Sequence, residues 1–371
     1  MSKNSTASTK KGSGVLAGLI LLVAGIGLLW YNEGRTVKTQ SAINEAKKAY
    51  VDVSSAKVDS KNDGKLVATK GKISLEDTEV LKDSKFNITA KAAKLTRKVE
   101  MYQWEEKCST DDDDKKTCTY DKVWSEKLID SDDFEKSGHD NPTSKPYESE
   151  VFYADNVKVG AFVLPEELIK SLSNNKKKDY DDLSAEYQNN VVGIKVDGNY
   201  LTNVKEEEPE IGDVRISYEY LTEQTVSIMA VQNGDTFEAF TSKKGKDIYT
   251  IVKGNKTGIQ ILEDMTSSNK FAKWFLRLLG IFLTVSAFGS MFSFINTLAN
   301  KVPVLGNIVS GTTSFISTVL GIAVSLVVIA IAWFRFRPIL SIILIVIGGA
   351  LVFFLKYYKK DEKNKETKDK E

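Results

Sequence analysis

The sequence contains little of what enzymes commonly use for catalysis. Its 371 residues include a single histidine, so a triad of nucleophile, histidine and acid would have to use His139. That residue lies with Asp140 and Asn141 in the loop-like stretch "GHDNP", whose Asn-Pro pair favours a turn. G-x-S-x-G, P-loop, G-x-G-x-x-G and H-E-x-x-H patterns are all missing. We therefore expect no enzyme activity, no catalytic residue and no cofactor, and we treat the three residues as polar loop candidates.

The chain also lacks an excess of either charge and is poor in cysteine. Its 51 basic and 50 acidic residues give a net charge of +1, and no basic stripe with interleaved aromatic residues indicates a nucleic-acid partner. The two cysteines, Cys108 and Cys118, flank an acidic loop. With His139 far away in the sequence, they do not complete a four-ligand metal set. They are either free thiols or a disulfide that clips two strands, and we favour the disulfide in a non-cytosolic compartment.

What the sequence does have is four long apolar segments, gathered at its two ends. They are residues 14–31, 274–299, 308–333 and 339–358. Each has about 18 or more residues, enough to cross a hydrocarbon core of about 30 Å as a helix. The first lacks a small-residue cleavage site, which favours an anchor over a signal peptide. Arg277, near the start of the second, can extend to the interface, so no charge is expected at depth and a transporter is not indicated.

The lysines predict the orientation in the membrane. The N-terminal tail, residues 1–13, carries three lysines and no acid, and the charged tail 359–371 begins with two lysines. Four spans put both tails on one side, which the positive-inside rule makes cytoplasmic. Residues 32–270 would then form a non-cytoplasmic domain, lumenal or extracellular. Arg335 and Arg337, between the last two segments, fall on the far side, against the rule.

The central region is expected to be a mixed domain rich in strands. "KVEMYQWEEKC" and "CTYDKVWSEKL" alternate like the strands of a hairpin, and 213–221 and 224–232 also alternate. An Asn-Gly turn follows, so residues 213–253 are predicted to form an antiparallel meander. Short helices are expected at 165–172 and 258–269. The predicted fold class is an α+β membrane protein, with one N-terminal and three C-terminal transmembrane helices around a large extramembrane domain.

Small residues and hydroxyls recur along single faces of three apolar segments. These candidate helix-packing residues are Gly14, Gly18 and Gly25 in the first segment, Ser286, Ser290, Ser293 and Thr297 in the second, and Ser310, Ser314, Ser317, Gly321 and Ser325 in the third. In a bilayer, such faces let helices approach closely and hydrogen bond across the contact. We interpret them as packing surfaces within the bundle or between protomers, and pore lining is the alternative.

A polar cluster, Asn32, Glu33 and Arg35, follows the first apolar segment. Glu33 and Arg35 are two residues apart, so they do not share a helix face. The predicted topology places Arg335 and Arg337 on the same side of the membrane as this cluster. We therefore expect Glu33 to pair with one of these two arginines, which would lock the first segment and the domain to the other three helices.

Six stretches, taken together, resemble the LUMA family, which is also called the transmembrane protein 43 family. They are "NEGRTVKT", "RKVEMYQW", "SGHDNP", "PEIGDVRISYEYL", "SSNK" and "FRPIL", and they occur in the family's order. The resemblance implies a multi-pass membrane protein with its large domain in the endoplasmic reticulum lumen or its equivalent. Eukaryotic members are expected in the endoplasmic reticulum and inner nuclear membrane, where they associate with themselves, with emerin and with lamins. For a bacterial member the plasma membrane is expected.

The resemblance and the helix faces together favour a self-associating scaffold that organises membrane protein complexes. The expected partners are the lipid membrane, a second copy of the chain and other membrane proteins. A role in an ion-conducting complex, also proposed for the family, makes a leak-channel subunit the alternative, and a lipid-acting enzyme is a third possibility. This chain departs from the family in its cysteine-flanked "DDDDKK" loop.

Overall fold

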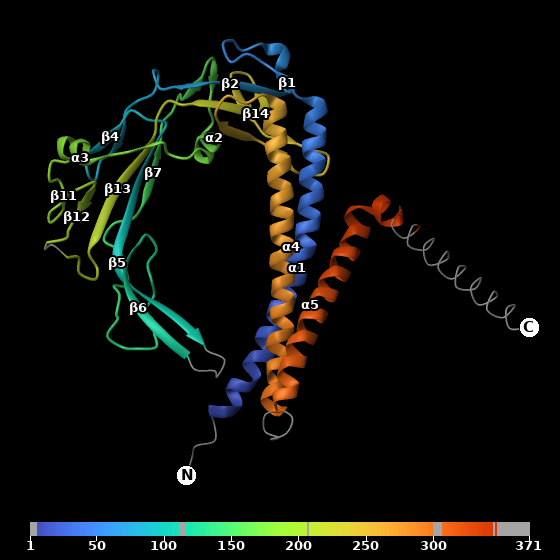
Figure 1. Ribbon diagram of the computed structural model, residues 1–371. Helices are drawn as coiled ribbons and strands as arrows, with labels where there is room; N and C mark the ends of the chain where they lie inside the picture. The colour runs from blue at the N-terminus through green and yellow to red at the C-terminus, as the bar shows by residue number, and fades with distance from the viewer. Residues whose placement is uncertain (1–5, 111–115, 206–207, 300–305, 344–345, 347–371) are drawn as a thin grey trace, which may run out of the picture. The chain divides into compact units, whose positions relative to one another are not determined.

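The computed structural model describes residues 6–110, 116–205, 208–299, 306–343 and 346 (Figure 1). The chain divides into two compact units. One unit is helical and comprises residues 1–47, 241–246 and 262–371. The other is rich in strands and comprises residues 48–240 and 247–261.

Three long helices build the helical unit: α1 (Thr6–Ala49), α4 (Gly258–Ala299) and α5 (Gly306–Phe336). Among the described residues, three helical stretches are long and apolar enough to cross a membrane: Gly14–Ala49, Gly258–Phe292 and Ser314–Phe336. The 44 residues of α1 and the 42 of α4 correspond to lengths of about 65 Å, twice the hydrocarbon thickness. Both helices therefore continue well beyond the expected apolar segments.

The expected separate helix at 258–269 is wrong, because these residues are the first turns of α4. No proline or glycine interrupts the chain between Gly258 and Gly280, so nothing ends the helix before the apolar segment begins. By contrast, α5 ends at Phe336, since Pro338 disfavours helical backbone at Arg337. The expected fourth span, 339–358, lies mostly outside the described residues. At its start, residues 338–343 are described and helical. The tail 359–371 also lies outside them.

Two seven-stranded sheets form most of the second unit. The first has the order β15-β14-β2-β8-β9, with β1 on β2 and β18 on β14. Its strands are β1 (Val51–Asp52), β2 (Leu66–Ser74), β8 (Lys158–Val159), β9 (Phe162–Val163), β14 (Thr225–Asn233), β15 (Thr236–Glu238) and β18 (Thr250–Lys253). A core that includes Val67, Phe162 and Ile228 packs against this sheet.

The second sheet has the order β11-β12-β13-β5-β6, with β10 on β13 and β7 on β5. Its strands are β5 (Lys94–Thr110), β6 (Lys116–Ser125), β7 (Glu150–Tyr153), β10 (Lys176–Lys177), β11 (Lys195–Asp197), β12 (Tyr200–Thr202) and β13 (Val214–Leu221). A second core, which includes Leu95, Met101 and Ile216, covers it. Two short ribbons pair β3 (Leu81–Asp83) with β4 (Ile88–Ala90) and β16 (Phe240–Thr241) with β17 (Asp247–Ile248). The short helices are η1 (Ser60–Asn62), α2 (Glu166–Ser171) and α3 (Tyr180–Glu186).

The predicted meander is correct for the antiparallel hairpin of β14 and β15. It is wrong for β18, which pairs with β14 instead of β15, and for β13. That strand lies in the other sheet, where it pairs with β5 over eight residue pairs. Residues 226–232 of β14 are all buried, because the strand is central and has β2 on one side and β15 and β18 on the other. The connection at 222–224 carries no tight-turn residue, so consecutive strands go to different sheets.

Candidate functional site

A charged junction joins the three long helices at Glu33. Its carboxylate is buried, with 1% of the residue exposed. Oε1 accepts a hydrogen bond from Nε of Arg277 on α4 at 2.6 Å, and Oε2 accepts one from Nε1 of Trp333 on α5 at 3.0 Å. A buried carboxylate is costly unless it is paired and hydrogen bonded. The three contacting side chains therefore specify which faces of α1, α4 and α5 meet.

Aromatic rings surround the cations of the junction. The guanidinium carbon of Arg277 lies 5.1 Å from the ring centre of Trp274 and 5.8 Å from that of Trp333. Arg337 lies 5.7 Å from the Trp333 ring, and its Nη2 is 4.0 Å from Oε2 of Glu33. Cation–π contacts of this kind strengthen where water is excluded. The junction therefore combines one buried anion with two arginines and two indoles.

Amide side chains continue the polar contact between α1 and α4. Asn32 Nδ2 donates to the backbone oxygen of Lys273 at 3.0 Å, and Asn269 Nδ2 donates to that of Thr36 at 3.1 Å. Asn32 is fully buried, and Asn269 is 4% exposed. These bonds fix the axial register of two antiparallel helices over more than one turn.

One of the two arginines expected to pair with Glu33 does so, and the structure adds a closer partner. Arg337 lies near the carboxylate, whereas Arg335 is exposed. The closest cation is Arg277, which was expected to extend to the membrane interface. Arg35 turns along its own helix, where Nη2 donates to Asn32 Oδ1 at 3.4 Å. Arg277 could have been suspected as a partner because it is the one charge between Trp274 and Ala299.

Glycines let α1, α4 and α5 approach closely on the N-terminal side of Glu33 along α1. A Cβ atom added at Gly18 would lie 2.6 Å from Met291 Cγ, and one at Gly25 would lie 2.8 Å from Thr284 Cγ2, both on α4. At Gly321 on α5, an added Cβ would lie 2.6 Å from the Cα of Val285. The glycines therefore occupy contacts within this chain, as small-residue motifs do in membrane bundles.

Two hydroxyls meet at the centre of the α4–α5 contact. Thr284 Oγ1 and Ser325 Oγ are 2.6 Å apart, and both residues are fully buried. Of the expected stripe, Ser317 is buried and Ser286 and Ser290 are partly buried. Ser314 is exposed, and Gly14 is partly exposed. The side chains of Ser293 and Ser310 lie outside the described residues. The hydroxyls thus contribute to helix packing: Ser325 belongs to the expected stripe, and sequence reasoning missed its partner Thr284.

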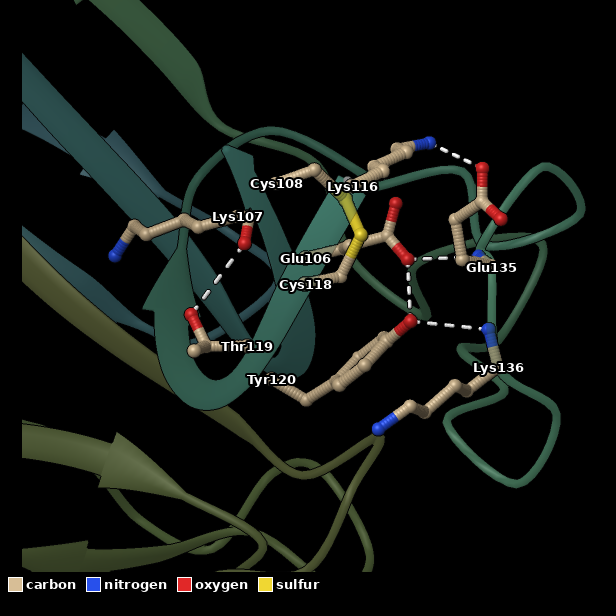
Figure 2. The surroundings of a disulfide bond; sticks show 9 residues. All are labelled: Glu106, Lys107, Cys108, Lys116, Cys118, Thr119, Tyr120, Glu135 and Lys136. Carbon is tan, nitrogen blue, oxygen red and sulfur yellow. Dashed lines mark hydrogen bonds and ion pairs between the residues drawn. A yellow bond between two sulfur atoms is a disulfide. The ribbon is translucent and has the colours of Figure 1, made fainter. Parts of the chain in front are cut away.

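The long hairpin of β5 and β6 carries the two cysteines. Cys108 and Cys118 are opposite each other in the register and form a disulfide (Figure 2). Beside it, Glu106 accepts hydrogen bonds from Tyr120 Oη at 2.5 Å and from the backbone N of Glu135 at 2.7 Å (Figure 2). These bonds hold the pKa of Glu106 below its usual value. Glu106 and both sulfurs are close enough to share an ion, but a disulfide supplies no thiolate ligand.

The polar loop candidates pack against the same hairpin. The ring of His139 stacks on Tyr120 at 3.9 Å between centroids and meets Trp104 edge-on at 4.6 Å. The side-chain amide of Asn141 pairs with the backbone of Trp104 as a neighbouring strand would. Its Oδ1 accepts from Trp104 N at 2.7 Å, and its Nδ2 donates to Trp104 O at 2.9 Å. Asp140 is exposed. The contacts of His139 and Asn141 tie the loop to β5.

A second buried charge cluster lies in the strand-rich unit. Arg97 on β5 donates to Asp83 at 2.5 Å and to Glu150 at 2.7 Å, and Tyr218 Oη on β13 donates to Asp83 at 2.7 Å. Asp83, Arg97 and Tyr218 are each at most 4% exposed. Burial, followed by the charge of Asp83, raises the pKa of Tyr218 far above its usual value. Two of the stretches that carry the family resemblance, "RKVEMYQW" and "PEIGDVRISYEYL", meet in this cluster.

Comparison with known proteins decides the family. The family described as Transmembrane protein 43 matches residues 101–338. The chain belongs to this family. It is 28% identical over 359 residues to Transmembrane protein 43 of Homo sapiens, covering 91% of this chain and 88% of that protein. It is 27% identical over 355 residues to the Transmembrane protein 43 homolog of Drosophila melanogaster, covering 90% of this chain and 92% of the relative. No solved structure matches.

Membership of the Transmembrane protein 43 family confirms the resemblance found in the sequence, because LUMA is another name for it. The matched region begins within β5 and ends at Pro338, two residues beyond α5. It therefore contains Arg277 and Trp333, the two partners of Glu33 with the shortest contacts. The chain is a membrane protein with three candidate spans and a large strand-rich domain.

Proposed function

We propose that the protein is a non-catalytic, self-associating membrane scaffold that holds its strand-rich domain at one membrane surface and organises other membrane proteins. The observation that carries the proposal is the junction at Glu33. The buried polar groups there hydrogen bond α1 to α4 and to α5, so the three helices form one rigid unit, here called the platform. A rigid platform suits a protein whose task is to hold partners in place. In a eukaryote, we propose the endoplasmic reticulum and inner nuclear membrane as its location.

An exposed apolar stripe on α4 supports self-association. Phe271, Phe275, Leu278 and Phe282 recur at helical spacing, and each is more than half exposed. Such a stripe needs a lipid or protein surface to cover it, since exposed apolar patches of this kind mark interaction sites. We propose that a second copy of the chain covers part of it.

Disulfide trapping tests the self-association. Leu278→Cys introduces one free thiol on the stripe, because both native cysteines are bonded to each other. Oxidation in vesicles should yield a covalent dimer. Ile322→Cys on α5, which is also exposed, is the control and should give less. A monomeric protein that yields no dimer from either variant contradicts self-association.

Bilayer recordings distinguish the scaffold from a leak channel. The Thr284–Ser325 pair is buried in a helix contact, which favours packing over pore lining for these hydroxyls. Purified protein in planar bilayers should therefore show no steady conductance. A steady conductance that disappears in the variant Ser314→Leu/Ser317→Leu would replace the scaffold with a channel subunit.

A further inference from the structure

A polar hollow of about 430 Å³ opens in the helical unit beside the Glu33 junction. Its walls come from α1, from α4, from the 241–246 loop and from the residue that follows α5. The lining residues are Thr36, Val37, Gln40, Ser41, Asn44, Lys244, Asn269, Lys270, Lys273 and Arg337. The volume falls in the range of small-ligand sites in proteins. Four separate segments of the sequence thus contribute to one concave surface.

The charge of this hollow is of one sign. Lys244, Lys270, Lys273 and Arg337 line it, and no carboxylate of the described residues does. Glu33 forms an ion pair with Arg337 at 4.0 Å, but Arg277 and Trp333 bind the same carboxylate at shorter distances. Among the described residues, none of the three lysines has a carboxylate partner. Four cations gathered in one concavity, with only the carboxylate of Glu33 paired to one of them, repel each other, and a bound anion would relieve that repulsion.

Glu45, on α1 near the hollow, also has hydrogen-bond donors of its own. Glu45 accepts from Ser41 Oγ at 3.2 Å and from the backbone N of Lys243 at 2.9 Å. The bond from Lys243 holds the 241–246 loop against α1, and Lys244 follows directly. The contact with Lys243 therefore positions Lys244 at the hollow, and the carboxylate of Glu45 already accepts two hydrogen bonds.

One buried polar atom in the wall also lacks a partner. Asn269 is 4% exposed, and its Oδ1 has no hydrogen bond within the described structure. Its Nδ2 is already committed to Thr36 O. An unpaired buried acceptor is costly and calls for a donor. A ligand that carries both an anionic group and a hydroxyl would satisfy the cations and this oxygen together.

The height of the hollow along α1 matches the membrane surface. Trp30, Trp274 and Trp333 lie at the level where α5 ends, as aromatic belts do at the interface. Thr36 to Asn44 follow Trp30 by roughly 9 to 21 Å at 1.5 Å per residue. Lys273 and Arg337 lie close to the tryptophans. The hollow therefore begins at the headgroup layer and opens away from the hydrocarbon.

We propose that this hollow binds a phosphate group, and that Lys244, Lys270, Lys273 and Arg337 are its ligands. Phosphate suits the site because lysine and arginine both bind its oxygens through charge-assisted bonds. The position at the membrane surface admits the headgroup of an anionic phospholipid, and its opening to water admits a free phosphate ester. A hydroxyl on the same ligand would donate to Asn269 Oδ1.

Native mass spectrometry of the full-length protein in detergent tests the site. The probes are short-chain phosphatidylglycerol, short-chain phosphatidylcholine and inorganic phosphate. Lys244→Gln/Lys270→Gln removes two exposed cations from the hollow, and Lys47→Gln/Lys65→Gln removes two exposed lysines that do not line it. We expect phosphatidylglycerol to bind the first variant about tenfold more weakly than the wild type, and the control variant to match the wild type.

The probes separate the two sources of phosphate. A lipid site retains phosphatidylglycerol in preference to phosphatidylcholine, and millimolar phosphate displaces the lipid only partly. A site for free phosphate esters binds inorganic phosphate in the wild type, loses it in the Lys244→Gln/Lys270→Gln variant and shows no preference between the lipids. Equal phosphatidylglycerol occupancy in both variants, together with no variant-dependent phosphate binding, would overturn the proposal.

Discussion

Arg277 Nε lies 2.6 Å from Glu33 Oε1, so two residues 244 positions apart form a buried ion pair between α1 and α4. Removing one member of such a pair leaves an uncompensated charge. Glu33→Gln should therefore lower the free energy of unfolding by about 3 kcal/mol. Heating in detergent, followed by size-exclusion chromatography, reports the folded fraction. Glu263→Gln, at an exposed position of α4, should leave it unchanged.

The same pair can be tested by replacing it entirely. Glu33→Leu/Arg277→Met removes both charges and keeps apolar volume, which is often neutral or stabilising for buried pairs. We expect the double variant to recover much of the stability lost in Glu33→Gln. A double variant less stable than Glu33→Gln would mean that Arg277 is not the partner that matters.

Alanine substitutions at two glycines, Gly321 and Gly289, separate the effect of close helix packing on stability from that of helix propensity. Gly321→Ala would place a Cβ against the backbone of Val285, whereas no described atom lies within 4 Å of a Cβ at Gly289. Alanine favours a helix over glycine by about 1 kcal/mol. Gly289→Ala should therefore match or exceed the wild type in thermal stability, and Gly321→Ala should fall below it. Equal shifts for both variants would show that α5 does not pack on α4 at this residue.

Tyr218 should make the stability of the strand-rich unit sensitive to alkaline pH. Its pKa is raised in the folded protein, so its contribution is complete below the unfolded value of about 10 and declines as the pH rises above it. Thermal unfolding of the wild type at pH 8, 10 and 11 should show a steeper decline than that of Tyr218→Phe. Tyr180→Phe, at a residue that is 52% exposed, should keep the wild-type slope.

The disulfide should stabilise the β5–β6 hairpin. The ten-residue separation of Cys108 and Cys118 corresponds to about 3 kcal/mol in the chain-entropy account. A reducing agent should lower the thermal midpoint of the wild type and leave that of Cys108→Ser/Cys118→Ser unchanged. Alkylation of both cysteines in the untreated wild type would contradict the bond.

Local patterns in the sequence predicted local structure well. The hairpin that carries the cysteines follows from alternation within two adjacent stretches, and the Asn-Gly turn after β14 follows from two residues. The pairing of β13 with β5 joins segments more than a hundred residues apart, and alternation does not identify the partner strand. The sheet assignment therefore could not be read from the sequence.

The candidate site shows the same division. The sequence marked Glu33 as a junction residue because it directly follows an apolar segment. It could not rank Arg277 against Arg335 and Arg337, since only the antiparallel packing of α1 on α4 brings Arg277 to Glu33. The Thr284–Ser325 contact was missed for a similar reason: the serine stripe fitted the helical period, but the residues that meet depend on how the helices cross.

The ion pair between Glu33 and Arg277 also sets an order of events during synthesis. A ribosome adds roughly 5 to 20 residues per second, so Arg277 is made on the order of 10 to 50 s after Glu33. For that interval the first helix carries a carboxyl group whose partner does not yet exist. The first helix can therefore reach its final packing only after α4 has been made, so the later part of the chain completes the helical unit.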